Sequence, residues 1–172
     1  MISSFDDEKV RDTMKALVVY ESFFGNTEKI AQAIAGGLAA HFEVTVLRVA
    51  DARPEQFKGF DLVVIGSPTR GFQPSDGTKA LLKTLPAGAL QGIKVAAFDT
   101  RMDVKEVNNA FLTFMERIFG YAAEPIGRKL AAAGGTLALK PEGFFVHGSE
   151  GPLWDGEIER AEKWGEKIAV SD

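Results

Sequence analysis

The stretch ALVVYESFFGNTEKIAQAI, residues 16–34, decides the fold. It opens with ALVVY (16–20), a continuous apolar run rich in β-branched residues, which predicts a strand buried on both faces. A short loop follows, and residues 27–40 then carry an apolar stripe at helical spacing, formed by Ile30, Ile34 and Leu38. The stripe predicts an amphipathic helix. A buried strand, a loop and a helix in this order are typical of the first part of a βαβ unit.

The same alternation continues along the chain. Further strands are predicted at residues 43–49, 61–65, 95–98 and 144–146, and the first of these is the least apolar and reads as an outer strand. Helices are predicted at 79–84, within 104–133 with a break near Gly120, and at the end of the chain. Apolar strands alternating with helices favour an α/β fold, in which a parallel sheet is covered by helices on both faces. Ligands in such sheets bind beyond the carboxyl ends of the strands, so the segments to search follow Tyr20, Ile65, Phe98 and Val146.

Composition narrows the class of protein. The chain has 172 residues, enough for one domain, and it contains no cysteine, which excludes disulfides, thiolate metal sites and cysteine catalysis. Its 20 basic and 24 acidic residues give a net charge of −4, which argues against nucleic-acid binding. No apolar run approaches the ~20 residues of a membrane span. We expect a disordered tail over residues 1–13, a single domain over 14–172, and, because the start lacks a secretory signal, a cytoplasmic location.

The loop after the first strand has the features of a phosphate site. Ser22 and Thr27 supply hydroxyls, Thr27 is well placed as the helix N-cap, and Gly25 allows close approach of the backbone. The helix start adds the positive end of a dipole. No cation lies in the loop, which suits a monoester phosphate held by neutral donors. The nucleoside-triphosphate and dinucleotide glycine patterns are absent. A capped helix after an ordinary turn is the alternative.

The same residues resemble the flavodoxin signature. Its positions are filled by Val18, Val19, Tyr20, Ser22, Gly25, Thr27, Ala31 and Ile34. The resemblance extends through Gly66-Ser67-Pro68-Thr69 and Phe98-Asp99-Thr100-Arg101, and covers residues 14–170. It implies a short-chain, FMN-binding, flavodoxin-like protein: a three-layer α/β sandwich with a five-stranded parallel sheet of order 2-1-3-4-5.

The resemblance also implies cofactor-binding residues. The first loop would surround the FMN phosphate, through Ser22, Phe23, Phe24, Gly25, Asn26 and Thr27. One wall of the ring site would be formed by Ser67, Pro68, Thr69, Arg70, Gly71 and Phe72, and the other by Asp99, Thr100, Arg101 and Met102. Phe24 stands where electron-transfer flavodoxins usually have a hydroxyl, and the second wall lacks their tyrosine. Phe72 could stack on the ring or fill the edge of the domain.

Three side chains are candidates for the chemistry itself. Arg70 and Arg101 would favour the anionic reduced flavin, and we expect Arg101 to contribute more because it directly follows a central strand. Pairing of either arginine with Asp99 or Asp103 is the alternative. His147 closes the last strand and is a further catalytic candidate, with an ordinary surface histidine as the alternative.

Three functions remain open at this point. The favoured one is an FMN-dependent oxidoreductase that reduces quinones or similar acceptors with NAD(P)H, or that transfers electrons. The second is a non-catalytic electron carrier, with a reductase as donor and a protein as acceptor. The third is a binding or regulatory module that has lost FMN. No cluster of metal ligands is evident, and a phosphoacceptor receiver domain is excluded because Gly66 stands where it needs an aspartate.

Overall fold

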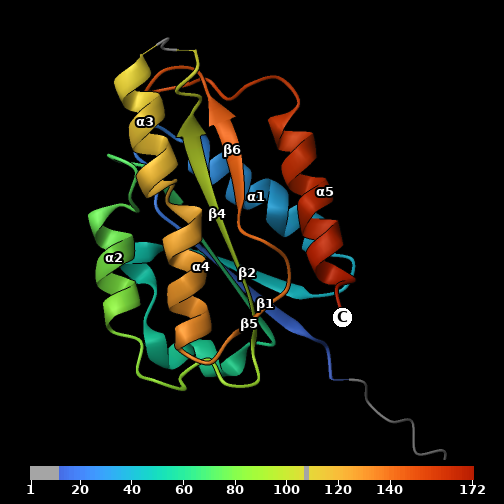
Figure 1. Cartoon of the computed structure of the whole chain (residues 1–172). Helices are drawn as coiled ribbons and strands as arrows, with labels where there is room; N and C mark the ends of the chain where they lie inside the picture. The colour runs from blue at the N-terminus through green and yellow to red at the C-terminus, as the bar shows by residue number, and fades with distance from the viewer. Residues whose placement is uncertain (1–11, 107–108) are drawn as a thin grey trace, which may run out of the picture.

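The computed structural model describes residues 12–106 and 109–172, so most of the expected tail, residues 1–11, lies outside the described residues. Its centre is a parallel sheet of order β2-β1-β3-β4, whose fifth position is shared by two short strands that both pair with β4 (Figure 1). The strands are β1 (Lys15–Tyr20), β2 (Glu43–Arg48), β3 (Leu62–Pro68), β4 (Lys94–Met102), β5 (Thr136–Leu137) and β6 (Glu142–Val146). The predicted parallel sheet and its strand order are confirmed, with the last strand divided in two.

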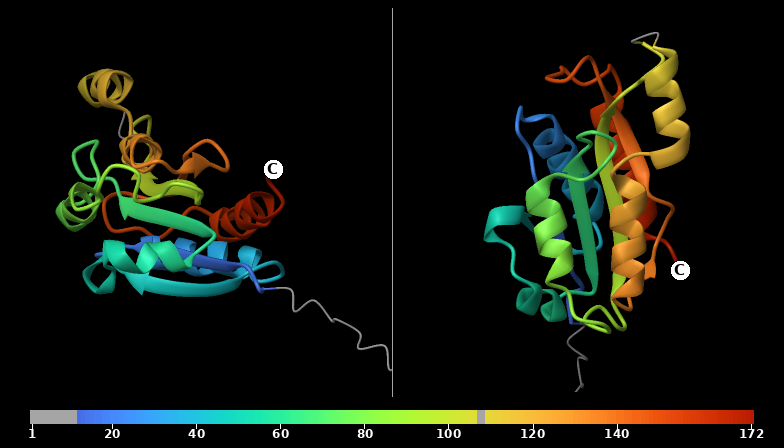
Figure 2. Two further views of the ribbon diagram at one scale, coloured as in Figure 1. Left: turned by 90° about the horizontal axis from the view of Figure 1, so that it is seen from below. Right: turned by 60° about the vertical axis from the view of Figure 1, so that its left-hand side comes forward.

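Helices cover both faces of this sheet (Figures 1 and 2). The helices α1 (Asn26–Leu38) and α5 (Glu157–Ala169) pack together on one face, and α2 (Asp76–Lys83) and α4 (Ala123–Ala132) cover the other. Two short 3₁₀ helices, η1 (Val49–Asp51) and η2 (Pro54–Gly59), precede β3, and α3 (Ala110–Phe119) precedes α4. None of the helices in the described ranges combines the length and apolar character needed to traverse a lipid bilayer.

The first strand shows why the sheet needs helices on both sides. Val18 and Tyr20 belong to the core under α1 and α5, whereas Leu17 and Val19 belong to the core under α2 and α4. All four side chains are buried. Because alternate side chains of a strand point to opposite faces, a continuous apolar run is stable only between two helical layers. The predicted burial of this strand is confirmed, and so is the more exposed outer strand β2.

Two strands run further than the sequence predicted. β3 continues to Pro68 and β4 to Met102, and the register pairs Ser67 with Asp99 and Pro68 with Thr100. Along its extension, β4 also pairs with β6, from Phe98 to Met102. The apolar run ends earlier because the added residues hold polar side chains at the end of the sheet. Segments predicted as free loops are therefore partly fixed by sheet hydrogen bonds.

The segment 104–133 divides at Gly120 as predicted, but two large apolar side chains of its first half are exposed. Phe111 and Phe114, which share a helical stripe and would ordinarily indicate a buried face, are 65% and 57% exposed. The reason is topological: α4 occupies the layer over the sheet, and α3 lies outward of it, near the carboxyl ends of β4 and β6 (Figures 1 and 2).

Candidate functional site

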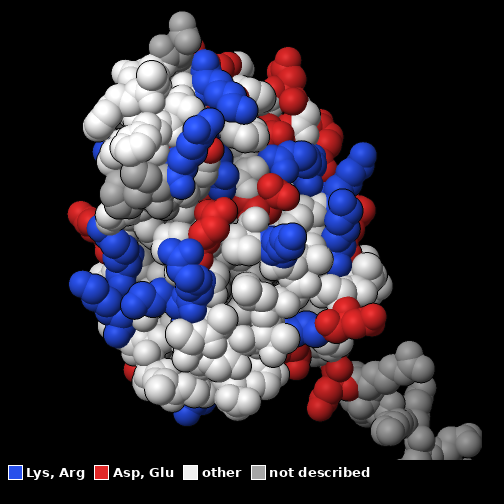
Figure 3. Space-filling model, in the orientation of Figure 1, with Lys and Arg blue, Asp and Glu red and all other residues white. Residues whose placement is uncertain are grey.

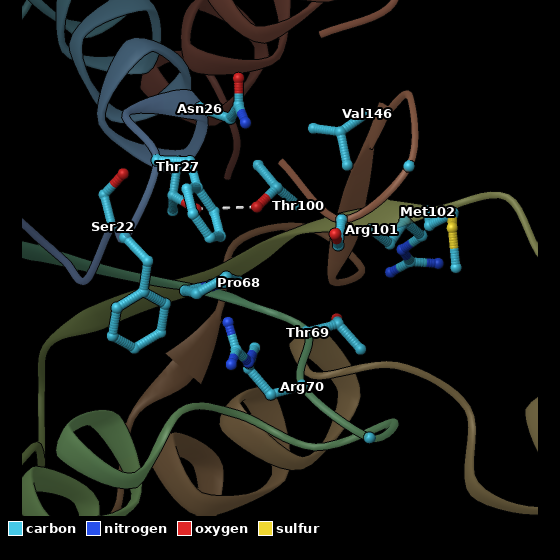
Figure 4. A pocket seen from close by; sticks show the side chains of 15 residues that line it. Ser22, Asn26, Thr27, Pro68, Thr69, Arg70, Thr100, Arg101, Met102 and Val146 are labelled. Atoms are coloured by element: carbon cyan, nitrogen blue, oxygen red, sulfur yellow. Dashed lines mark hydrogen bonds between the residues drawn. The ribbon is translucent and has the colours of Figure 1, made fainter. Parts of the chain in front are cut away.

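A pocket of about 350 Å³ opens at the carboxyl ends of β1, β3, β4 and β6 (Figure 4). Four segments that are far apart in the sequence supply its walls: the loop after β1, the end of β3 with its loop, the end of β4, and the loop after β6. Its lining consists of Ser22, Phe23, Phe24, Asn26, Thr27, Pro68, Thr69, Arg70, Gly71, Thr100, Arg101, Met102, Val146, Gly148 and Ser149. Parallel strands place their carboxyl ends at one edge, which is why these segments meet.

The first loop is shaped to bind an anion. Gly25 has φ +88°, a left-handed conformation that a side chain would disfavour, and it precedes α1 without a side-chain cap. The Gly25 N–H donates to the Ser22 hydroxyl over 3.1 Å. Since no side chain caps the first turn of α1, its backbone N–H groups are available to a phosphate, which the helix dipole also attracts.

Thr27 has a different role from the one predicted. It lies inside α1 rather than at the N-cap, and its hydroxyl forms a 2.8 Å hydrogen bond with the Thr100 hydroxyl on β4 (Figure 4). Both side chains are buried. Asn26 donates from Nδ2 to the Glu150 carbonyl over 2.8 Å, which connects α1 to the loop after β6. These hydrogen bonds attach the start of α1 to β4 and to the loop after β6.

The wall after β3 is a tight hairpin. Arg70 and Gln73 exchange two backbone hydrogen bonds, of 2.8 and 3.1 Å, around Gly71 and Phe72. Both central residues have positive φ, +55° and +62°, as in a type I′ turn. The turn directs Phe72 away from the pocket and toward Tyr121, at a ring-centroid distance of 6.4 Å. Phe72 therefore lies outside the lining of this pocket.

Arg70 is a pocket cation without a carboxylate partner in the described part of the chain. Its guanidinium carbon lies 5.0 Å from the centroid of the Phe23 ring, at the pocket mouth. Phe23 is itself 52% exposed, so this contact leaves the arginine beside solvent and beside the cavity.

Arg101, by contrast, is paired with other side chains of the protein. Its Nε and Nη2 donate to the two oxygens of Asp99, each over 2.7 Å, and its guanidinium stacks 3.8 Å above the Tyr121 ring. Asp99 is fully buried and also accepts from the Ala123 N–H over 2.8 Å. Burial acts to lower the pKa of Arg101, but hydrogen bonding and attraction to Asp99 raise it above its usual value. The structure thus shows the alternative arrangement for Arg101, pairing with Asp99, and the greater contribution expected of Arg101 to flavin chemistry stays a prediction.

The remaining candidates lie at the margin of the site. His147 does not line the pocket: its Nδ1 is 3.4 Å from Glu106, and its ring stacks on Trp154 at 5.7 Å. Neither tyrosine of the chain lines the pocket, and Met102 stands at the end of β4. A ring bound here would meet no tyrosine on that side.

Of the sixteen predicted cofactor residues, those outside the lining are Gly25, Ser67, Phe72 and Asp99. Gly25 and Asp99 still shape it, through a turn and an ion pair, and Ser67 accepts the Ser75 N–H over 2.9 Å. Sequence reasoning missed Val146, Gly148 and Ser149, although it had marked the segment after Val146. In the described residues, no group of three or more histidine, aspartate or glutamate side chains could hold a metal ion.

Comparison with known proteins agrees with this geometry. A family model described as Flavodoxin matches residues 18–164. Among solved structures, flavodoxin 2 from Bacillus cereus has a TM-score of 0.73 at 23% identity, with coverage of 90% of this chain and 97% of that one. A flavodoxin from the domain Archaea has a TM-score of 0.67 at 23% identity, with coverage of 91% and 96%. At these identities the structural likeness establishes the fold.

A third structure belongs to a differently described relative. The flavodoxin, WrbA-like protein from Agrobacterium tumefaciens has a TM-score of 0.64 at 18% identity, with coverage of 91% of this chain and 95% of that one. The match again extends over nearly the whole of both chains. The pocket therefore sits in a complete copy of the shared fold.

Proposed function

Because this chain belongs to the flavodoxin family, whose members bind FMN, we propose that it is an FMN-dependent oxidoreductase that reduces quinones or similar acceptors by two electrons, with NAD(P)H as donor. The observation that carries this proposal is Arg70, a cation on the wall of the pocket with no carboxylate partner in the described residues. A positive charge beside a flavin favours the anionic, fully reduced ring. Electron transfer in general is what the family's fold supports.

The pocket fits FMN on three counts. Its volume of about 350 Å³ lies in the range of small-molecule sites. The uncapped start of α1, with Ser22 and Asn26 at the same end, offers neutral donors, which suit a monoester phosphate. The ends of β3 and β4 then provide two walls for a flat ring, Pro68 to Gly71 on one side and Thr100 to Met102 on the other.

The chain's own residues would divide the work. The first loop and α1 bind the phosphate, and the Thr27–Thr100 hydrogen bond holds the phosphate loop against the ring wall. The Asp99–Arg101 pair fixes the end of β4 without adding net charge to the site. Arg70 supplies the charge, and the absence of a tyrosine from the lining leaves one ring face open to a donor or acceptor. The bound flavin supplies the ability to take up and release electrons.

The test is a quinone-reductase assay on the purified, FMN-loaded protein. We expect NADH or NADPH to be oxidised when a soluble benzoquinone is present, at a rate proportional to FMN content. Anaerobic titration should reduce the flavin in one two-electron step, with a single set of isosbestic points. Reduction that requires a separate reductase protein and proceeds in two resolved one-electron steps would refute the proposal.

One observation favours the electron carrier as a second candidate. Phe23 and Phe24, at the pocket mouth, are 52% and 51% exposed. Exposed aromatic side chains beside a redox centre suit docking of a protein partner. The same titration separates the two functions, since a carrier would transfer electrons to a protein and show no activity with quinone and NAD(P)H alone.

A further inference from the structure

A second cavity, of about 330 Å³, lies between α2 and α4, outside the FMN pocket. We call it the α2–α4 groove. Its floor is apolar and is formed by Phe72, Pro74, Leu82 and Pro125. The hairpin after β3 separates the two cavities, because Arg70 and Gly71 line the FMN pocket whereas Phe72 and Gln73 line the groove.

The rim of the groove carries a concentrated positive charge. Lys79, Lys83, Arg128 and Lys129 line it, and no carboxylate does, in a chain whose net charge is −4. Figure 3 shows basic side chains gathered over α2 and α4. Lys79 pairs over 3.1 Å with Asp76, whose side chain is fully solvated, so the pairing is weak. In the described residues, Lys83, Arg128 and Lys129 take part in no ion pair.

Phe72 makes the floor of the groove unusual. It is the one non-glycine residue with positive φ among those described, at +62°. For a bulky side chain this conformation is unfavourable and persists only where the surroundings enforce it. Here the two Arg70–Gln73 hydrogen bonds enforce it, and Phe72 lines the same cavity as the four cations.

We propose that the α2–α4 groove binds an aromatic anion of nucleotide size, with its ring on Phe72 and its phosphate or similar anionic groups among Lys79, Lys83, Arg128 and Lys129. Charge complementarity argues for an anion, since four cations line the groove, only Lys79 among them has a carboxylate partner, and no carboxylate lines the groove. The apolar floor argues for an aromatic body in addition to the charge.

The dimensions argue for a small molecule rather than a macromolecule. At 1.5 Å per residue, the eight residues of α2 extend about 12 Å, which limits the length of the groove. A volume of about 330 Å³ is also within the range of small-ligand sites. An acidic protein segment would contact the rim but would not need the apolar floor.

The test is calorimetric titration of the full-length protein, saturated with FMN, with metal-free ADP as the probe. We expect ADP to bind without displacing FMN. Adenosine lacks the anionic groups and pyrophosphate lacks the aromatic ring, so each should bind at least tenfold more weakly than ADP. Binding of ADP should weaken as salt concentration rises.

Matched variants locate the site. Lys83→Gln with Lys129→Gln should weaken ADP binding at least tenfold, whereas Lys58→Gln with Lys163→Gln, the same charge change on exposed residues elsewhere, should leave it unchanged. Phe72→Gly relieves the positive φ and removes the ring, so it should weaken ADP while preserving the fold, and Phe72→Tyr should retain binding. These readouts do not depend on flavin activity, so they remain decisive if the proposed reductase activity fails.

Three results would overturn the proposal. The first is displacement of FMN by ADP, which would place the probe in the flavin pocket. The second is equal binding by the Lys83/Lys129 variant and its control. The third is binding of polyglutamate but not of ADP, which would assign the groove to an acidic macromolecule.

Discussion

At the scale of single residues, two arginines beside the pocket differ in what surrounds them. The Arg101 guanidinium faces the buried Asp99 carboxylate at 2.7 Å, whereas the Arg70 guanidinium lies over the exposed Phe23 ring and has no carboxylate partner in the described residues. A guanidinium paired with a carboxylate presents almost no net charge to its surroundings. Arg101 therefore exerts a weak electrostatic field on the site although it lies close to it. We therefore expect Arg70, rather than Arg101, to influence a bound flavin.

Replacing Arg70 should change the flavin potential. We expect Arg70→Gln to lower the two-electron reduction potential by about 30 mV, equivalent to about 1.4 kcal/mol, because the anionic reduced ring loses a nearby positive charge. Arg53→Gln, an exposed arginine next to η2, is the charge-matched control and should leave the potential unchanged. Potentiometric titration of the three proteins measures the difference, and equal shifts in both variants would contradict the assignment.

Replacing Arg101 should instead change stability. Arg101→Gln leaves the fully buried Asp99 without its partner, and we expect a loss of about 3–5 kcal/mol in the free energy of unfolding. The double variant Asp99→Asn, Arg101→Gln removes both charges and should recover part of that loss. Urea unfolding provides the values. If the double variant were the less stable of the two, the ion-pair account would be wrong.

At the scale of the elements, the close packing of α1 against α5 requires glycine at one position in each helix. A methyl group at Gly37 would overlap the backbone of Glu162 and come within 2.9 Å of the Glu166 nitrogen, and one at Gly165 would overlap the Ile34 carbonyl. The two helices therefore touch through their backbones. Gly36, next to Gly37, has open space around it.

Neighbouring glycines in α1 should thus respond in opposite ways to the same substitution. Gly37→Ala should destabilise the protein by about 1–3 kcal/mol, because the added methyl separates the helices. Gly36→Ala should stabilise it by about 0.5–1 kcal/mol, because alanine favours the helix and meets no neighbour. Thermal unfolding of both variants decides the matter, and a loss of stability in Gly36→Ala would refute the packing argument.

The start of α5 is attached to β6 by a carboxylate. Glu157 accepts the Phe145 N–H over 2.7 Å and two hydrogen bonds from Arg160, over 2.8 and 2.7 Å. Burial acts to raise the pKa of Glu157, but the hydrogen bonds from Arg160 and from the Phe145 N–H outweigh it and lower the pKa below its usual value. Glu157 therefore stabilises the folded state in its ionised form.

The sign of this shift predicts a pH dependence. Because the folded-state pKa is lowered, the contribution of Glu157 is present above the unfolded value of about 4.3 and is lost as pH falls through the folded value. We expect Glu157→Gln to cost about 1–3 kcal/mol at pH 7 and progressively less below pH ~4. Chemical denaturation at several pH values measures the difference, and a gap that widened in acid would contradict the assignment.

At the scale of the whole molecule, the pocket is where four strand ends meet. The loop after β1, the hairpin after β3, the end of β4 and the loop after β6 all line it, and the Thr27–Thr100 and Asn26–Glu150 hydrogen bonds link three of these segments. A ligand that contacts all four stabilises the assembled fold relative to the unfolded chain.

FMN should therefore raise the stability of the entire domain. At a free concentration of 100 times its Kd, the expected gain is about 2.7 kcal/mol, and removal of FMN should reverse it. Thermal denaturation with and without FMN measures the shift, and riboflavin, which lacks the phosphate, should give a smaller one. A melting temperature that did not respond to FMN would exclude binding at this pocket.

The sequence by itself determined the layered α/β fold and marked the loop after β1 as a candidate phosphate site. Both follow from local patterns: apolar runs such as 16–20 need cover on two sides, the stripe of α1 needs a face to pack on, and Gly25 stands where only a glycine turns readily. Such patterns are set by neighbours within a few residues and can be read without knowing the rest of the fold.

Only the tertiary structure decided which polar side chains pair with one another. The sequence contains Asp99, Arg101 and Tyr121, but their stacking and pairing depend on α4 packing beside β4. Thr27 and Thr100 are seventy-three positions apart in the sequence. Their hydroxyls meet only because β1, β3 and β4 are neighbours in the sheet. Phe111 and Phe114 follow a core pattern yet lie outside, because α4 already covers the sheet. Ion pairs and long-range hydrogen bonds depend on distances in space, and so does the choice of the helix that covers the sheet. The order of residues does not specify these distances.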